Sequence, residues 1–285
     1  MIINRRTLLT AASGLAVWPA FAEDPPPLFA AYERETGGRA GLYAENLATG
    51  AKIAWRADER FLMCSTFKAS LAAFVLARVD RGEDQLDKLV SYGPQDLLDY
   101  APVAKRNLAY GAMSVADMCK ATVELSDNTC ANMLLARTGG PAALTAFWRA
   151  TGDAVSRLDH NEPELNRSRP GDPNDTTTPA AMAGNVRRFL LGEVLSQASR
   201  GHLTEWMINC KTGDNRLRAG LSKHWKIGNK TGTNGEDAAG DIAMTWPTSG
   251  GAVVICAYMQ GGAPKPDQFT AVFTKIGKMV GSKLA

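Results

Sequence analysis

Runs of β-type residues lie near both ends of the chain, and helical periods fill its middle. Two short runs, Ala40–Asn46 and Lys52–Trp55, flank Ala48-Thr49-Gly50 and predict a β-hairpin. The pattern predicts one antiparallel, five-stranded sheet built from both chain ends. The three strands predicted in the C-terminal third are Trp225–Asn229, Asp241–Trp246 and Ala252–Met259.

Apolar residues at helical spacing predict a helix at each end of the chain and six between them. We therefore expect an α/β fold in which helices flank the sheet and an all-α subdomain is inserted. The α/β part covers about residues 23–60 and 222–285, and the all-α part about 61–221. The predicted helices are Leu28–Thr36, Ala69–Arg81, Val115–Glu124, Thr129–Thr138, Pro141–Ala150, Thr178–Leu191, His202–Cys210 and about Asp267–Val280.

A polar stretch without clear periodicity lies between Arg157 and Pro179. A loop of that length inside a compact domain is usually functional. We therefore expect residues of this stretch to take part in the site.

Composition excludes several classes of function. The chain has 285 residues, of which 45% are hydrophobic and 21% charged, as in an ordinary globular protein. The net charge is +3 and no dense Lys/Arg run occurs, so nothing indicates nucleic-acid binding. Its three histidines are far apart and no Cys-x-x-Cys pair exists, which argues against a zinc site. No organic cofactor or oligomer is implied, and we expect a monomer.

Residues 1–22 have the pattern of an export signal. Arg5-Arg6 precede a short apolar core from Leu8 to Trp18, and Ala20-Phe21-Ala22 is an A-x-A cleavage site. The apolar run is too short for a membrane span, so we expect no membrane anchor after cleavage behind Ala22. The paired arginines are compatible with both Sec and twin-arginine export. We expect a periplasmic or secreted protein.

Five cysteines would make disulfides feasible in that compartment, although an odd count leaves one thiol unpaired. Cys64 is either half of a bridge or a small buried hydrophobe. The five are Cys64, Cys119, Cys130, Cys210 and Cys256.

Ser65-Thr66-Phe67-Lys68 precedes a largely apolar helical run. If the helix starts at or just before Ser65, its hydroxyl and the Lys68 ammonium lie one turn apart on one face. Unpaired N–H groups at a helix N-terminus also favour developing negative charge. This pair can therefore produce an activated serine without a histidine. For the motif alone, however, a capped helix with a surface lysine is the commoner case, so the interpretation depends on the rest of the chain.

Two further motifs supply polar groups for such a nucleophile. Ser126-Asp127-Asn128 lies between two predicted helices, where it could relay a proton and bind a carbonyl or simply cap a helix. Lys230-Thr231-Gly232-Thr233 follows a predicted strand, where it could bind a carboxylate, and its glycine would let substrate approach the backbone. The similar Lys211-Thr212-Gly213 has no strand before it and is interpreted as a loop outside the site.

Glu162-Pro163-Glu164-Leu165-Asn166 lies within the long polar stretch. A carboxylate and an amide four residues apart in a turn could hold one water between Glu162 and Asn166. The alternative is a solvated acidic loop.

The ordered set S-x-x-K, S-D-N and K-T-G resembles that of class A β-lactamases and penicillin-binding proteins. Ser126 follows Ser65 by 61 residues and Lys230 follows Ser126 by 104, as in class A. The likeness covers essentially the whole chain after the signal and implies the β-lactamase/D,D-peptidase-like fold. Other segments that resemble the family are Leu97–Val103, Glu162–Asn166, Pro170–Asp172, Asp175–Pro179 and Arg218–Leu221.

The resemblance implies hydrolysis of penicillins and cephalosporins through an acyl-enzyme, which confers antibiotic resistance. Ser65 would attack the lactam carbonyl, with the backbone N–H groups of Ser65 and Thr233 as the oxyanion hole. Either Lys68, or Glu162 acting through a water, would take the serine's proton. Ser126 would pass a proton to the leaving nitrogen.

Substrate contacts are implied in the same way. Asn128 would bind the side-chain amide of the substrate, Tyr100 would wall the mouth of the cleft, and Glu162 with Asn166 would hold the deacylating water. The carboxylate site would be lined by Lys230, Thr231 and Thr233.

An arginine for the substrate carboxylate is missing from its usual place in the family. The strand after K-T-G normally supplies it, whereas Ala238-Ala239-Gly240-Asp241 has none. Some members place it upstream instead, which here corresponds to Arg216. A surface arginine is the alternative.

Two positions depart from the family pattern. His160 stands where an arginine commonly pairs with the aspartate that is Asp175 here, which predicts a looser loop above about pH 7. Carbapenem-hydrolysing relatives pair the cysteine before the serine with one after K-T-G-T, where this chain has Asn234. The chain therefore has only one of the two cysteines of that bridge, and the resemblance does not imply the carbapenem-hydrolysing activity that accompanies it.

Two rival functions share the motifs. A penicillin-binding D,D-peptidase normally lacks the water-activating loop, so Glu162 and Asn166 argue against it. A non-catalytic penicillin-sensing domain would trap the acyl group, and the expected lack of a membrane anchor argues against a transmembrane sensor.

Overall fold

The computed structural model describes residues 26–167, 169–248 and 250–284. The predicted export signal, residues 1–22, lies outside the described residues. In the described part of the chain, no helix combines the length and the apolar character that a membrane span requires.

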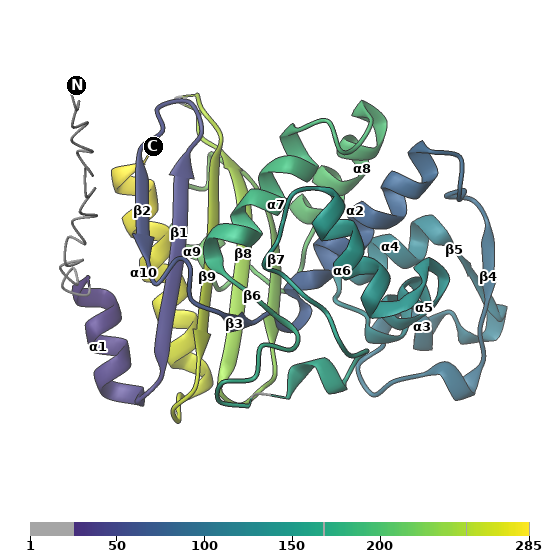
Figure 1. The fold of residues 1–285 in the computed structure, drawn as a ribbon, viewed down its shortest axis with the longest axis horizontal. Helices are drawn as coiled ribbons and strands as arrows, with labels where there is room; N and C mark the ends of the chain where they lie inside the picture. The colour runs from purple at the N-terminus through teal and green to yellow at the C-terminus, as the bar shows by residue number, and fades with distance from the viewer. Residues whose placement is uncertain (1–25, 168, 249, 285) are drawn as a thin grey trace, which may run out of the picture.

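A five-stranded antiparallel sheet has the order β2-β1-β9-β8-β7, which confirms the predicted sheet (Figure 1). The N-terminal hairpin β1–β2 joins the C-terminal strands through β1 and β9, with Arg39 opposite Gln260 and Asn46 opposite Val253. The five strands are β1 (Arg39–Asn46), β2 (Lys52–Trp55), β7 (Lys226–Thr233), β8 (Ala238–Trp246) and β9 (Val253–Gln260).

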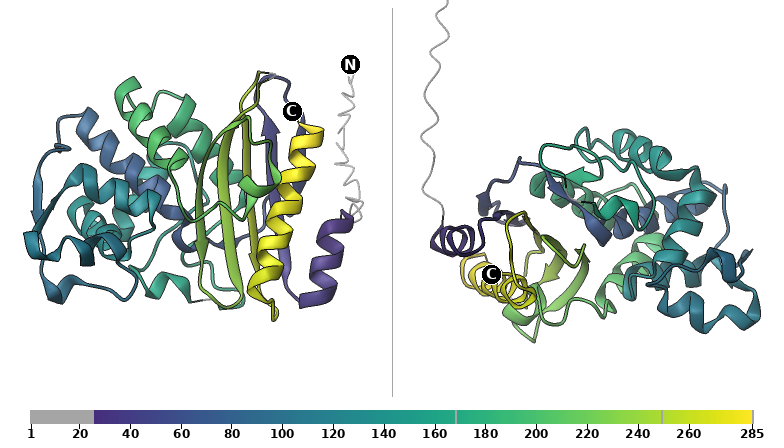
Figure 2. Two further views of the ribbon diagram at one scale, coloured as in Figure 1. Left: turned by 180° about the vertical axis from the view of Figure 1, so that it is seen from behind. Right: turned by 90° about the horizontal axis from the view of Figure 1, so that it is seen from below.

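Both faces of the sheet are covered because alternate side chains of each strand point to opposite faces. In β9, Val253 and Ile255 pack into one core with helices α1 and α10, while Val254 and Cys256 belong to the other. Figure 2 shows α1 and α10 side by side on the face away from the helical part. The helices are α1 (Pro27–Thr36), α2 (Phe67–Asp80), α3 (Pro102–Arg106), α4 (Val115–Glu124), α5 (Asn128–Thr138), α6 (Gly140–Ala150), α7 (Pro179–Leu191), α8 (Gln197–Ile208), α9 (Leu217–Gly220) and α10 (Pro266–Lys283).

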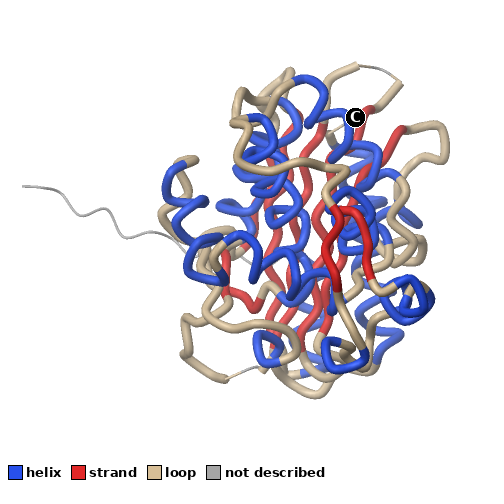
Figure 3. The backbone as a smooth tube through the Cα atoms, turned by 90° about the vertical axis from the view of Figure 1, so that its right-hand side faces the viewer, coloured by secondary structure: helices blue, strands red, loops and turns tan. Residues whose placement is uncertain are grey.

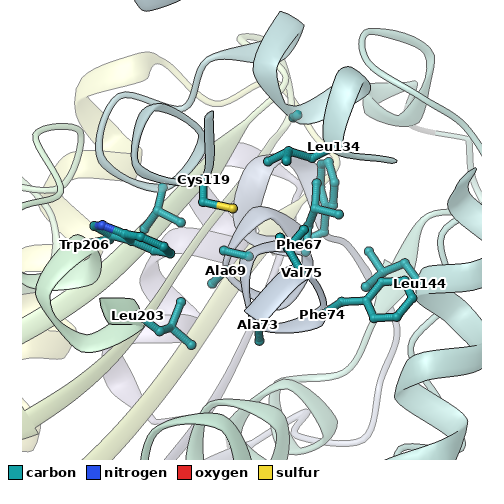
Figure 4. Packing of buried hydrophobic residues seen from close by; sticks show 14 of the residues in the cluster. Phe67, Ala69, Ala73, Phe74, Val75, Cys119, Leu134, Leu144, Leu203 and Trp206 are labelled. Carbon is teal, nitrogen blue, oxygen red and sulfur yellow. The ribbon is translucent and has the colours of Figure 1, made fainter. Parts of the chain in front are cut away.

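Helix α2 forms the centre of the helical part. Its residues are buried from Phe67 to Ala77, as expected for a helix that is apolar on all sides. Neighbouring helices surround it (Figure 4). The side chains drawn around it there include Cys119 of α4, Leu134 of α5, Leu144 of α6, and Leu203 and Trp206 of α8.

The segment that we expected to be all helical also contains four short strands. They form two small antiparallel pairs, β3–β6 and β4–β5. Figure 3 looks onto the end of the molecule where the β4–β5 pair lies, with the main sheet behind the helices. The four strands are β3 (Phe61–Leu62), β4 (Leu89–Ser91), β5 (Ala112–Ser114) and β6 (Thr176–Thr177).

Several predicted boundaries were wrong. Strand β7 continues to Thr233 because the K-T-G-T residues pair with β8, with Thr231 opposite Asp241. Helix α8 begins at Gln197 rather than at His202, because the Ser196 side chain accepts the Ser199 N–H and caps the helix.

Candidate active site

Ser65 lies in the 3₁₀ turn η1 (Cys64–Thr66), directly before α2. The sequence is compatible with a helix that starts at or just before Ser65. The α-helix itself starts at Phe67, so Ser65 precedes it and does not lie in its first turn. The Ser65 Oγ lies 3.1 Å from Glu162 Oε1. The nucleophile candidate therefore has a carboxylate within hydrogen-bond distance.

Lys68 is completely buried one turn further along. Its Nζ forms an ion pair with Glu162 Oε1 at 3.0 Å and donates to the Ser126 carbonyl at 2.8 Å and to Asn128 Oδ1. Burial lowers the pKa of Lys68, and the Glu162 carboxylate opposes that shift. The surface-lysine alternative for this motif is wrong.

Ser126 occupies a left-handed backbone conformation, with φ of 59°, between α4 and α5. Its Oγ accepts hydrogen bonds from Lys230 Nζ at 3.0 Å and from Lys68 Nζ at 3.4 Å. Its neighbour Asp127 caps α5 by accepting the Cys130 N–H. The helix cap, Asp127, is thus adjacent in the chain to the site residue Ser126. The Ser126 hydroxyl is hydrogen-bonded to both Lys68 and Lys230.

Strand β7 supplies the wall opposite α5. Burial lowers the pKa of Lys230 to about 7, and the charges of Lys68 and Arg216 act in the same direction. A Cβ on Gly232 would lie 2.8 Å from both the Met63 oxygen and the Ser65 nitrogen. A side chain at this position would therefore collide with the turn that carries Ser65. This collision explains the glycine more directly than the predicted approach of substrate to the backbone.

Glu162 is held from two sides. Its Oε2 accepts the Asn166 Nδ2–H at 2.6 Å, and its backbone exchanges two hydrogen bonds with the Asn132 side chain, at 2.8 and 2.9 Å. Sequence reasoning missed Asn132. It lies one helical turn after Asn128 in α5, and that spacing could have indicated that both amides face the same site.

Arg216 precedes α9 and is mostly buried. One guanidinium nitrogen donates to the carbonyls of Gly232 and Gly240, at 2.9 and 2.8 Å. Burial lowers the pKa of Arg216, and Asp241 opposes the shift. The surface-arginine alternative is therefore wrong, and the side chain reaches the cavity.

The predicted site residues meet around a cavity of about 360 Å³. Lys68 and Lys230 lie buried beneath it, and Tyr100 is half exposed at its edge. Thr212 also lines it, with its hydroxyl 2.5 Å from the Thr231 hydroxyl, so excluding 211–213 from the site was wrong. The lining residues are Ser65, Tyr100, Ser126, Asn128, Glu162, Asn166, Thr212, Arg216, Thr231, Gly232 and Thr233.

The model of the β-lactamase enzyme family matches residues 28–284. The chain is 52% identical to β-lactamase L2 of Stenotrophomonas maltophilia over 252 residues, which cover 88% of this chain and 83% of that protein. It belongs to the class A serine β-lactamases.

Solved class A structures have the same fold. A reconstructed ancestral class A β-lactamase of Gram-negative bacteria is 52% identical, with a TM-score of 0.86, and the match covers 89% of this chain and 97% of that one. The L2 structure in complex with relebactam is 50% identical, with a TM-score of 0.86 and coverage of 90% and 95%. The predicted fold class and enzyme class are confirmed.

The loop of this β-lactamase that carries Glu162 is closed by His160 and Asp175. Their side chains meet at 2.6 Å between Nδ1 and Oδ2, so the expected contact exists. Asp175 Oδ1 also accepts the N–H groups of Asp159 and His160. The hydrogen bond to Asp175 raises the pKa of His160.

All five cysteines of this class A enzyme are buried, free thiols. Asn234, at the position of the second cysteine in bridged relatives, uses its side chain within the β7–β8 turn, where it contacts Asp237 and accepts three backbone N–H groups. Cys64 is thus a small buried hydrophobe rather than half of a bridge. No cluster of three or more His, Cys, Asp or Glu suited to a metal occurs in the described residues.

Proposed function

We propose that this class A β-lactamase hydrolyses penicillins and cephalosporins through an acyl-enzyme on Ser65 and thereby confers resistance to them. One observation carries the proposal: Glu162 Oε1 lies 3.1 Å from Ser65 Oγ and 3.0 Å from Lys68 Nζ, while its other oxygen is bound by Asn166. Nucleophile, cation and general base are therefore within one hydrogen-bond network.

In acylation, Ser65 Oγ attacks the lactam carbonyl and loses its proton to Lys68 or, through a water, to Glu162. Desolvation favours the neutral amine of Lys68 and so its use as a base, while the ion pair with Glu162 favours the charged form. The backbone N–H groups of Ser65 and Thr233 stabilise the oxyanion, and losing one such donor typically costs ~10²–10³ in rate. Ser126, joined to both lysines, protonates the leaving nitrogen.

In deacylation, Glu162 and Asn166 bind the water and Glu162 removes its proton. This step separates a β-lactamase from both rivals, since a D,D-peptidase or a penicillin sensor keeps the acyl group much longer. The double hydrogen bond from Asn132 holds the Glu162 backbone in place for it.

Substrate recognition uses the other wall. Lys230, Thr231, Thr233 and Arg216 bind the carboxylate of the antibiotic, Asn128 binds its side-chain amide, and Tyr100 packs at the mouth. We further propose that the protein acts as a monomer in the periplasm after cleavage behind Ala22. The feature that supports the location is the A-x-A pattern behind the short apolar core of residues 8–18.

Incubation of purified protein with nitrocefin or benzylpenicillin tests the proposal. Many turnovers per enzyme, with little covalent adduct by intact mass, are expected. A stable one-to-one adduct without turnover would instead identify a penicillin-binding or penicillin-sensing protein.

A further inference from the structure

Asp241 lies on β8 directly behind Arg216 and is completely buried. Burial raises its pKa to about 6, so the carboxyl is ionised at pH 7.5. A buried carboxylate is costly unless its oxygens are hydrogen-bonded. Its partners therefore show what it stabilises.

Those partners belong to the segment that carries Arg216. Asp241 Oδ2 accepts the Leu217 N–H at 3.1 Å, which is the peptide group directly after Arg216. Its Oδ1 accepts the Asn229 Nδ2–H at 3.0 Å, and Asn229 Oδ1 accepts from Arg218 at 2.8 Å. The Asn229–Asp241 pair thus holds Leu217 to β8 and Arg218 to β7.

The N-terminal side of the segment rests on the same group. A Cβ on Gly213 would lie 1.9 Å from Asn229 Nδ2, so only glycine allows the chain to pack there. Both ends of the segment from Gly213 to Arg218 therefore contact the Asn229–Asp241 pair.

Arg216 itself lacks an ionic anchor. Within the described residues no acidic side chain forms an ion pair with it, and its nearest polar contacts are two backbone carbonyls. Its backbone angles, φ −111° and ψ −128°, lie outside the main allowed regions. The guanidinium is held by the two backbone carbonyls and lies over the Phe273 ring, 5.2 Å from its centroid, while the backbone from which it extends depends on how the flanking peptides are held.

We infer that Asp241 is a positioning residue for substrate recognition, which holds Arg216 in the orientation that binds the carboxylate of the antibiotic. This inference rests on the proposed role of Arg216. Asp241 does not itself line the cavity. Its carboxylate contacts the 213–218 segment through the Leu217 N–H and, by way of Asn229, through Arg218.

The sign of the effect distinguishes positioning from simple electrostatics. Removing a negative charge behind Arg216 would, by charge alone, strengthen binding of an anion and lower KM. If Asp241 acts by positioning, Asp241→Asn raises KM, because an amide cannot accept both hydrogen bonds.

The test compares benzylpenicillin with its uncharged methyl ester at pH 7.5. We expect Asp241→Asn to raise KM for the acid about three- to tenfold, the loss of one charged hydrogen bond, with kcat and the ester KM little changed. The double variant with Arg216→Ala should add nothing to the KM of Arg216→Ala alone. Thr245→Val, a buried change on the same strand at a hydroxyl without a hydrogen-bond partner, is the matched control.

Each other outcome has a defined meaning. An unchanged or lowered acid KM in Asp241→Asn, with a raised KM in Arg216→Ala, overturns the inference alone. An unchanged KM in Arg216→Ala contradicts the proposed role of Arg216 instead. Equal losses of kcat on acid and ester would make Asp241 a purely structural residue. If Asp241→Asn does not fold, Asn229→Ser, which removes the amide between Asp241 and Arg218, must raise the acid-to-ester KM ratio.

Discussion

The active-site cavity has two walls, and the buried charges of the two walls are compensated differently. The loop wall consists of Glu162 and Asn166 together with Lys68. The strand wall consists of Lys230, Thr231 and Thr233 of β7 together with Arg216. On the loop wall, Glu162 is paired with Lys68, and both side chains are fully buried. On the strand wall, Lys230 and Arg216 form no ion pair within the described residues. The loop wall has its ion pair without a ligand. In the part of the chain that the structure describes, the two cations of the strand wall make hydrogen bonds only to a hydroxyl and to backbone carbonyls, and Asp241 acts on Arg216 without forming an ion pair with it.

This difference assigns different steps to the two walls. Buried cations without a counter-ion are costly, and the lowered pKa values of Lys230 and Arg216 reflect that cost. In the function that we propose, the carboxylate of the antibiotic forms the ion pair that these cations lack, so changes on the strand wall should act mainly on KM. Changes on the loop wall should act mainly on kcat, because its groups work after the substrate is bound.

The largest effect is expected for Glu162→Ala. Without its general base, deacylation should slow by about 10²–10⁴, while acylation persists and an acyl adduct accumulates. Steady-state kcat and intact mass after mixing with benzylpenicillin measure both. Glu164→Ala, an exposed glutamate of the same loop, is the control and should behave as wild type. Equal kcat values for the two variants would remove the distinction between the walls.

Arg216→Ala should produce the next largest effect. Loss of a charge-assisted hydrogen bond to the carboxylate should raise KM for penicillins about tenfold or more, with a smaller change in kcat. Initial-rate kinetics provide both constants, and Arg167→Ala, an exposed arginine at the loop, is the control. An unchanged KM would show that Arg216 does not recognise substrate.

Raising the pH should weaken the strand wall selectively. The Lys230 ammonium, with a pKa of about 7, loses its proton as pH rises, so kcat/KM should fall about fivefold between pH 7 and 8, mainly through KM. In Lys230→Arg the charge persists, and the fall should move to higher pH. A fall carried by kcat alone would contradict the assignment to Lys230.

The smallest effect concerns the loop wall and its His160–Asp175 contact. Because Asp175 raises the pKa of His160, the stabilisation is fully present below about pH 6.5 and is lost as pH rises through the higher, folded-state pKa. The side chain of His160 is half exposed, so we expect tryptic cleavage at the loop to accelerate by no more than about fivefold at high pH. His160→Gln, whose side chain does not titrate and adds no tryptic site, corrects for the protease's own pH dependence. Equal rates for the protein between pH 6 and 8 would refute the idea.

Most of the residues that the sequence predicted for the site line the cavity, because the groups of each motif are close together in the chain. Ser65 with Lys68 and Glu162 with Asn166 are separated by one helical turn or less. Sequence reasoning missed Asn132, although the one-turn spacing from Asn128 could have indicated it, because the contact with Glu162 exists only in the folded chain. It excluded Thr212 with its loop, because the contact with Thr231 likewise forms only on folding.

Boundaries and short elements were also hard to predict for physical reasons. The start of α8 depends on one capping hydroxyl, that of Ser196, which no period reveals. The β3–β6 pair has two residues in each strand, too few for an alternation to be recognised. Helix α4, with a clear period and a Ser114 cap, was predicted from Val115 to Glu124 as observed.

The strand order β2-β1-β9-β8-β7 also determines when each strand can pair during synthesis of the chain. The N-terminal hairpin emerges from the ribosome first, yet β1 pairs with β9, whose last residue is Gln260. At a translation rate of about 5–20 residues per second, on the order of ten seconds or more pass between the synthesis of β1 and that of β9. During that interval the unpaired edge of β1 is exposed to other chains. The helical middle can collapse earlier, but the strand that carries Lys230 cannot complete the site until almost the whole chain has been made.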